Sequence, residues 1–161
     1  MLGATVAAGA VFAVTAIHLD ATLVELARVS VLGAALGALV CADLAEHRIP
    51  NRIVVPATLV CAALLLVDGV QMELLGGLAV VTLIVVLGLL WPASFGMGDV
   101  KLALLVVAGL GGVAVQALLV GLVLAAVFGA LLILRDGRSA ATRALPLAPF
   151  VAGGAAVAML A

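Results

Sequence analysis

The chain has 161 residues, of which 68% are hydrophobic, 9% are charged, and the formal net charge is -1. An ordinary soluble domain is about half apolar and about a quarter charged, so this composition excludes one and predicts an integral membrane protein. Tyr is absent and Trp91 is the only Trp, which favours membrane helices over a barrel with aromatic girdles. We expect a single domain over residues 1–161.

Apolar segments follow one another along the chain, each near the length of about 20 residues that crosses a bilayer. The first has no basic residues before it, so we expect a first span rather than a cleaved signal peptide. The predicted fold class is all-α, a polytopic transmembrane helical bundle of about seven spans at residues 3–19, 29–46, 53–68, 74–91, 99–112, 114–134 and 145–160.

The division between the fifth and sixth spans depends on glycine. Leu102 to Leu134 carries no charge over 33 residues, about 50 Å as one helix and too long for a single crossing. Gly109, Gly111 and Gly112 are the expected point of reversal. A count of six spans stays open.

The distribution of basic residues predicts the orientation, because cytoplasmic loops carry an excess of Lys and Arg. One side holds only Arg28, together with Asp20, Glu25, Asp68 and Glu73. The other side, which we therefore expect to be cytoplasmic, holds the other six basic residues: Arg48, Arg52, Lys101, Arg135, Arg138 and Arg143. The N-terminus is then inside the cell.

Two isolated carboxylates fall at this same face. Asp43 lies near the end of the second span and Asp99 at the start of the fifth. An ionisable group at the edge of a membrane span is costly, so each is a candidate functional residue. Asp43 could instead pair with Arg48 or Arg52, and Asp99 could be a helix N-cap, with or without a catalytic role.

Several neighbours have expected roles beside these carboxylates. Gly96 and Gly98 precede Asp99 and would let an extended substrate backbone approach. Pro50 is expected to end the second helix and Asn51 to cap the third. Lys101 would either reach the membrane interface or orient a carboxylate. Pro146 and Pro149 open the last span, either to loosen its start beside a cavity or as ordinary first-turn prolines.

The cysteine and histidine side chains indicate neither a metal site nor a cofactor. Cys41 and Cys61 show no CxxC spacing and are expected to be buried as small hydrophobic residues. His18 is expected at the outer interface, far from the aspartates. His47 follows Asp43 by four residues, but a third ligand other than Glu46 is lacking nearby.

Three signatures in order resemble the type IV prepilin leader peptidases. They are Asp43 with Ile49-Pro50-Asn51, Gly96-Met97-Gly98-Asp99-Val100-Lys101-Leu102, and Pro146-Leu147-Ala148-Pro149-Phe150. The resemblance covers about residues 30–150 and implies a GxGD-type intramembrane aspartyl protease. It also implies a prepilin or pseudopilin as substrate, cut at the cytoplasmic face of the inner membrane. The expected partners are this substrate and the lipid bilayer, with no nucleic acid, and the oligomeric state is open.

The sequence departs from the larger members of that family at one place. Those members insert a cytoplasmic domain with paired CxxC motifs and also N-methylate the mature pilin. Here only Asp20 to Arg28 separate the first two spans, and no CxxC is present. The resemblance therefore implies the short, peptidase-only form.

Two aspartates in one site of low dielectric would share a proton, one acting as base and the other as acid. The helix dipoles suggest Asp99 as the resting base and Asp43 as the resting acid, since Asp99 begins a helix and Asp43 approaches the end of one. The alternatives are a small membrane transporter and a non-catalytic membrane subunit of a pilus or secretion assembly. A transporter would need acidic groups near the midplane or on both faces, whereas these two lie at one face.

Overall fold

The computed structural model describes residues 2–18, 21–69, 71–90, 96–137 and 145–161. Within them the chain forms α-helices and no strand. The helices are α1 (Leu2–His18), α2 (Leu23–Glu46), α3 (Asn51–Asp68), α4 (Gln71–Leu90), α5 (Met97–Leu110), α6 (Ala114–Asp136) and α7 (Ala148–Leu160). Asp20, Trp91, Arg138 and Arg143, which entered the predictions above, lie outside the described residues.

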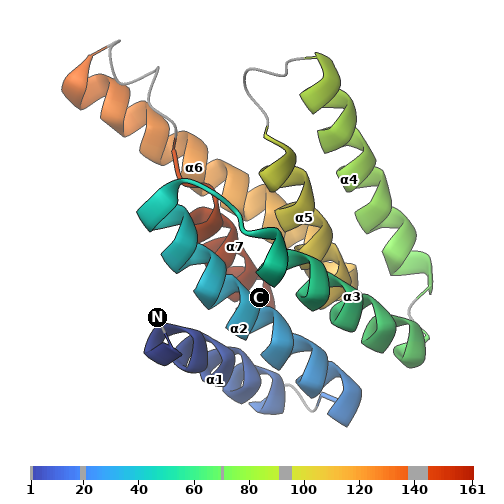
Figure 1. The fold of residues 1–161 in the computed structure, drawn as a ribbon. Helices are drawn as coiled ribbons and strands as arrows, with labels where there is room; N and C mark the ends of the chain where they lie inside the picture. Colours follow the sequence, from blue (N-terminus) through green and yellow to red (C-terminus); the bar gives the residue numbers. More distant parts are fainter. Residues whose placement is uncertain (1, 19–20, 70, 91–95, 138–144) are drawn as a thin grey trace.

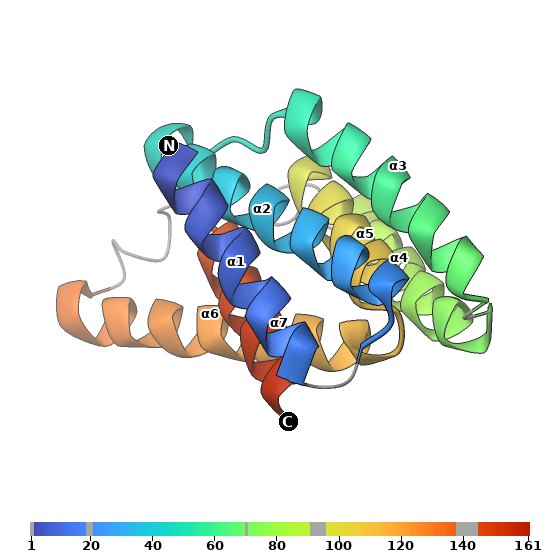
Figure 2. The same cartoon turned by 90° about the horizontal axis from the view of Figure 1, so that it is seen from below.

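The helices pack as one bundle around α2 and α5 (Figure 1). The helix α1 lies along α2, α3 joins α2 to α5, and α7 contacts both α2 and α6. Seen from below, α7 passes between α2 and α6 (Figure 2). The helix α4 contacts α5, α6 and the segment between those two helices. An all-α fold is therefore confirmed.

The predicted division of the long apolar stretch is confirmed. The helix α5 ends at Leu110, and Gly111 follows with φ 57° and ψ -117°. Residues other than glycine rarely adopt a positive φ, so a glycine at this position permits the break in the helix. A short 3-10 turn, Gly111–Val113, leads into α6, which runs back toward the level where α5 began (Figure 1).

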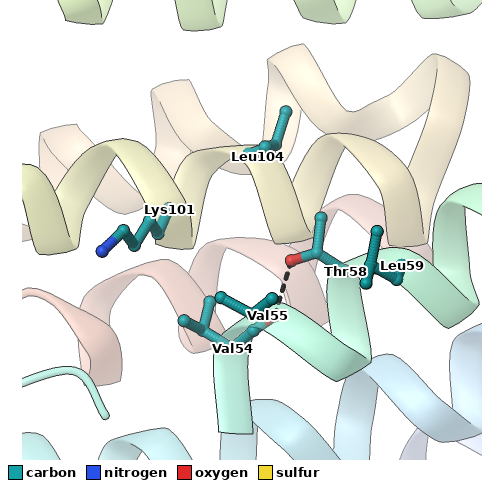
Figure 3. A pocket seen from close by; sticks show the side chains of 6 residues that line it. All are labelled: Val54, Val55, Thr58, Leu59, Lys101 and Leu104. Atoms are coloured by element: carbon teal, nitrogen blue, oxygen red, sulfur yellow. Dashed lines mark hydrogen bonds between the residues drawn. The ribbon is translucent and has the colours of Figure 1, made fainter. Parts of the chain in front are cut away.

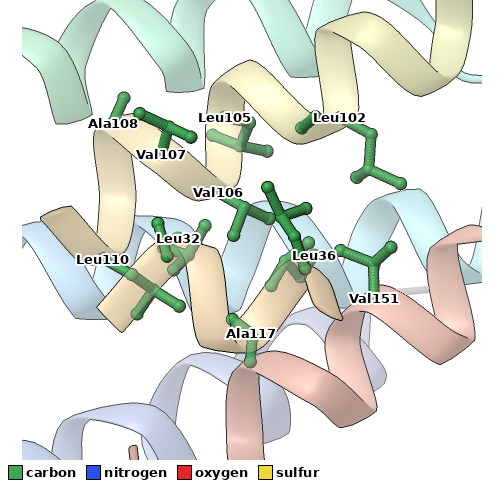
Figure 4. Packing of buried hydrophobic residues seen from close by; sticks show 14 of the residues in the cluster. Leu32, Leu36, Leu102, Leu105, Val106, Val107, Ala108, Leu110, Ala117 and Val151 are labelled. Atoms are coloured by element: carbon green, nitrogen blue, oxygen red, sulfur yellow. The ribbon is translucent and has the colours of Figure 1, made fainter. Parts of the chain in front are cut away.

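The core consists of aliphatic side chains from the two central helices. Leu32, Leu36 and Leu39 of α2 meet Leu102 and Leu105 of α5, and all five are at most 1% exposed. Figure 4 shows this contact, with Val151 of α7 at its edge. The packing fixes α2 and α5 relative to each other, and these are the helices that carry the two candidate aspartates.

The outer surface of the bundle is apolar as well. Leu59, Leu66, Leu119 and Leu134 are each more than half exposed. Two stretches are long and apolar enough to cross a membrane, Leu23–Glu46 and Met97–Asp136, and the second includes the break at Gly111. Counting only residues whose side chains the structure describes, the other apolar segments are shorter: Thr5–Thr15, Asn51–Val67, Leu75–Val86 and Ala148–Leu160.

The second helix ends at residue 46, as the expected span 29–46 predicted, but the residue that closes it differs from the prediction. The helix α2 stops at Glu46, and His47 adopts a left-handed conformation with φ 50°. The His47 N–H donates to the carbonyl oxygen of Asp43 at 2.9 Å, which closes the helix before Pro50 is reached. Pro50 is instead the N-cap residue of α3 and makes no side-chain capping bond. The prediction that Pro50 ends α2 was therefore wrong, because the break is set by the backbone of His47.

Candidate active site

Asp43 lies one turn before the end of α2, with only 6% of its surface exposed. Its Oδ2 accepts a hydrogen bond from the backbone N–H of Ala148 at 2.9 Å. Ala148 is the first residue of α7, so the carboxylate faces the positive end of that helix. The structure therefore joins Asp43 to a segment 105 residues further along the chain.

The start of α7 leaves one donor directed at Asp43. Leu147 is the N-cap residue, and its carbonyl oxygen accepts from the N–H groups of Phe150 and Val151, both at 3.1 Å. Pro149 has no N–H to donate. Pro149 thus lies in the first turn, as the sequence predicted, in a position where proline is tolerated.

Asp99 is the third residue of α5 and not its N-cap, which is Gly96. The Gly96 N–H donates to Asp99 Oδ2 at 3.1 Å, and the Asp99 N–H donates back to the Gly96 carbonyl oxygen at 3.0 Å. Gly96 has an extended backbone with φ -83° and ψ 152°. The pair forms a reciprocal cap that fixes the Asp99 carboxylate at the first turn of the helix.

The two carboxylates both lie beside the start of α7. Asp43 accepts the Ala148 N–H, and Asp99 borders a small cavity that Leu147 and Val151 also line. The two side chains are close enough for their charges to repel each other. The cavity is otherwise apolar, with Ile84 from α4, Ala103 from α5, and Leu118 and Leu122 from α6.

Lys101 makes a different contact from either one predicted. Its Nζ donates to Asn51 Oδ1 at 2.8 Å, which connects α5 to the first residue of α3. Asn51 therefore does not cap α3, since its side chain is bonded to another helix. Lys101 also lies at one end of a cavity of about 150 Å³ between α3 and α5 (Figure 3). The walls of that cavity are Val54, Val55, Thr58, Leu59 and Leu104.

Gly98 faces Ile49, in the loop between α2 and α3. A methyl group on Gly98 would lie 3.5 Å from the Ile49 side chain, an ordinary contact distance. Gly98 is the second residue of α5 and is not among the described glycines with a positive φ. The resting protein therefore does not need a glycine at this position for its backbone angles, and the role of Gly98 toward a substrate stays a prediction.

The other sequence candidates take no part in this arrangement. His47 is exposed at the end of α2. Cys61 is buried, as expected, and its thiol contacts the Arg28 carbonyl oxygen at 3.7 Å, while Cys41 is only partly buried. In the described part of the chain, no group of three His, Cys, Asp or Glu residues is placed to hold a metal ion.

The hydrogen bond from the Ala148 N–H to Asp43 was not predicted from the sequence. The segment from Pro146 to Phe150 was identified, but a backbone donor within it has no side-chain signature. The two prolines are the signal that could have found it. Where proline leaves few free N–H groups at a helix start, a remaining N–H can bond to a carboxylate on another helix.

The fold is an apolar helical bundle in which carboxylates from two helices lie beside the start of a third. Residues 30–134 match the model of the type IV leader peptidase family. The match covers more than half of the chain, so the protein belongs to this family, and its activity is in general that of a prepilin-type peptidase. Neither a curated protein nor a solved structure matches the chain. The family and the apolar helices together indicate a membrane protein.

Proposed function

We propose that this protein is an intramembrane aspartyl endopeptidase that removes the short basic leader of type IV prepilins or pseudopilins. Asp43 and Asp99 are its catalytic pair. The observation that carries the proposal is that these two carboxylates, 56 positions apart in the sequence, both lie beside the first turn of α7. A family of peptidases needs a hydrolytic site, and this pair supplies the acid and base that amide hydrolysis requires.

In the proposed reaction the pair holds one proton between its members. Two neighbouring carboxylates do not both ionise easily. The ionised member takes a proton from a water molecule as that water attacks the scissile carbonyl carbon. The protonated member donates a hydrogen bond to the carbonyl oxygen, and proton transfer to the leaving amine completes cleavage.

The cavity beside Asp99 supports the use of a water nucleophile. Its volume is about 20 Å³, and about 10–15 Å³ is enough for one water molecule. Its apolar walls leave Asp99 as the polar group that such a water would meet. A low dielectric around the site would also strengthen the interactions that develop in the transition state.

The environment of Asp43 changes the assignment of base and acid. The dipole of α2 alone disfavours an anion at Asp43, but the start of α7 faces the same carboxylate and offsets it. Each aspartate accepts one N–H from the first turn or cap of a helix. We therefore treat the two as a pair with a shared proton and no longer place the resting base at Asp99.

The neighbouring residues support the pair from outside. The bond between Lys101 and Asn51 holds the starts of α5 and α3 together next to the Asp99 turn. Pro50 begins α3, and Ile49 lies against Gly98. We propose that these contacts, together with Gly96, keep the turn that bears Asp99 in one geometry.

The proposal includes a membrane arrangement. All seven described helices cross the inner membrane, with the N-terminus and the aspartate pair at the cytoplasmic face. The exposed leucines of the bundle support a lipid-facing surface. Arg48 follows the end of α2 that bears Asp43, Arg52 lies at the start of α3, and Lys101 lies two residues after Asp99. Leader peptides begin in the cytoplasm, so this orientation brings the substrate to the site.

Leader cleavage in a membrane preparation with a co-expressed prepilin tests the function directly. We expect a shortened pilin with the wild-type protein and an uncut prepilin with Asp99→Asn at equal abundance. The exposed carboxylate of Asp136, at the far end of α6, offers a matched control, and Asp136→Asn should cleave normally. Equal cleavage by Asp99→Asn and the wild type would contradict the aspartyl mechanism. No cleavage of any tested prepilin by the wild type would favour a transporter or a non-catalytic subunit.

A further inference from the structure

We propose that α7 is a positioning element for Asp43, and that Gly154, in close contact with α6, sets its position. This inference rests on the proposed function, since it assigns a role within the same active site. It concerns residues remote from the carboxylates that act through the Ala148 N–H.

The Ala148 N–H has one described acceptor, Oδ2 of Asp43, at 2.9 Å. Both partners are buried, with Ala148 at 0% and Asp43 at 6% exposure. A buried carboxylate that loses a hydrogen bond bears the cost of its desolvation without compensation. The geometry of Asp43 therefore depends on where the first residue of α7 lies.

The position of α7 is set by a contact between its middle and the N-terminal part of α6. A methyl group on Gly154 would overlap the carbonyl oxygen of Ala117 and the backbone of Gly121. From the other side, a methyl group on Gly121 would lie 2.9 Å from the Cα atom of Val151. These contacts involve backbone atoms, so no side-chain rotation can relieve such an overlap. The two helix backbones touch here.

A displacement at this contact would reach Asp43. Gly154 is six residues from Ala148, about 9 Å along the helix at 1.5 Å per residue. A helix of this length moves as a rigid unit, and tightly packed interiors transmit such shifts. A backbone pushed away from α6 at Gly154 would carry the Ala148 N–H away from its optimal distance to Oδ2. Misplacement of a catalytic group by about 1 Å can reduce turnover about a hundredfold.

The neighbouring glycine offers a matched control. A methyl group on Gly153 would meet only a Leu124 methyl carbon, at 3.6 Å. Gly153→Ala and Gly154→Ala thus add the same atoms to adjacent residues of one helix, and only the second disturbs α6. Gly69→Ala provides a control for lost stability, since Gly69 has φ 77°, where alanine is strained, and its methyl would meet no other atom within 4 Å. Gly69 follows the last residue of α3, about 27 Å along that helix from Asn51.

The test measures kcat and KM for cleavage of a purified type IV prepilin by the full-length protein in detergent, with the unfolding temperature of each variant. We expect Gly154→Ala to lose at least about tenfold in kcat with KM unchanged, because substrate binding does not use this contact. Gly153→Ala should match the wild type. Gly69→Ala should unfold at a lower temperature and keep the kcat of the wild type. A kcat within twofold of wild type for folded Gly154→Ala would overturn the proposal, as would an equal loss of kcat in Gly69→Ala at equal loss of stability.

Hydrogen exchange at the Ala148 amide, followed by NMR, gives a readout that does not depend on proteolysis. We expect faster exchange in Gly154→Ala than in Gly153→Ala, because the Asp43 carboxylate no longer holds the proton. Should Gly154→Ala fail to fold, Gly121→Ala perturbs the same contact from α6, and the same two results are expected of it. Unchanged exchange and turnover in Gly121→Ala would contradict the proposal. A wild-type protein that cleaves no prepilin would refute the proposed function but not the role of α7. The exchange measurement would still test whether Gly154 sets the bond between Ala148 and Asp43.

Discussion

The Lys101 Nζ atom donates a hydrogen bond to Asn51 Oδ1 at 2.8 Å, across 50 residues of sequence. This bond joins the first turn of α5, which bears Asp99, to the first residue of α3. Lys101 is only half-buried and Asn51 is exposed, so the bond lies where water competes for both groups. Its contribution to stability should be modest, and its main effect is to fix the direction of α5 beside the loop that carries Ile49.

A double-mutant cycle on this bond should show coupling. We expect Lys101→Met and Asn51→Ala to be coupled by about 0.5–1.5 kcal/mol in the free energy of unfolding, the range for one net hydrogen bond. Arg52→Ala, next to Asn51, removes a side chain without a described bond to Lys101 and should show no coupling to Lys101→Met. Strictly additive effects of Lys101→Met and Asn51→Ala would mean that the bond does not hold the two helices together.

The aspartate pair should act as a unit. Asp43→Asn and Asp99→Asn should each abolish leader removal, because a pair that shares one proton needs both members. The double variant should cleave no worse than either single variant, since groups that act together are not additive. Immunoblots of the co-expressed prepilin, normalised to the amount of enzyme in the membrane, measure the outcome. Normal cleavage by either single variant would leave the other aspartate without its proposed partner.

Much of the fold followed from hydrophobic patterning. The expected segments 53–68, 114–134 and 145–160 agree with α3, α6 and α7 to within a few residues, because long apolar runs in helix-forming residues have few other structures open to them. The break near Gly111 followed from glycine, the residue that tolerates its positive φ. The end of α2 at Glu46 agrees with the expected span 29–46, but the way the helix is closed was not predicted. A left-handed conformation at His47 does not follow from its residue type.

The two candidate carboxylates could be predicted from the sequence, but their hydrogen-bond partners could not. Asp43 and Asp99 stood out because charged residues are scarce in this chain. The bonds to them come from the backbone of Ala148 and Gly96, and every residue but proline carries that donor. The bond of Lys101 was also missed, because which of several nearby acceptors a long flexible side chain meets depends on the packing of α3 against α5.

The proposed orientation predicts which loops an impermeant thiol reagent can label in intact cells. Arg48, between α2 and α3, and Leu23, at the start of α2, are both exposed and lie at opposite ends of that helix. With Cys41 and Cys61 replaced by Ala, Leu23→Cys should be labelled and Arg48→Cys protected until the cells are permeabilised. Labelling of Arg48→Cys alone would place the aspartates outside the cell, where no prepilin leader could reach them.

Gly98→Ala separates a structural from a substrate-directed role of the glycine before Asp99. Its methyl group would lie 3.5 Å from Ile49, so the resting protein has room for it. Replacing a helical glycine with alanine commonly stabilises a protein by about 0.4–1 kcal/mol, and the unfolding temperature should not fall. We nevertheless expect at least about a tenfold loss of turnover, equivalent to about 1.4 kcal/mol. An extended substrate beside Asp99 would take the place of the Ile49 side chain, and its backbone would then meet the added methyl group.

Because the variant meets no clash within the protein, a loss of cleavage at unchanged stability would report on the substrate alone. Gly76→Ala, in α4, adds its methyl group to open space and serves as the control, with the turnover of the wild type expected. Full activity of Gly98→Ala would show that the substrate does not approach the backbone at this residue. Gly98 would then be only part of the helix start that positions Asp99, and the extended substrate would have to bind along another face of the site.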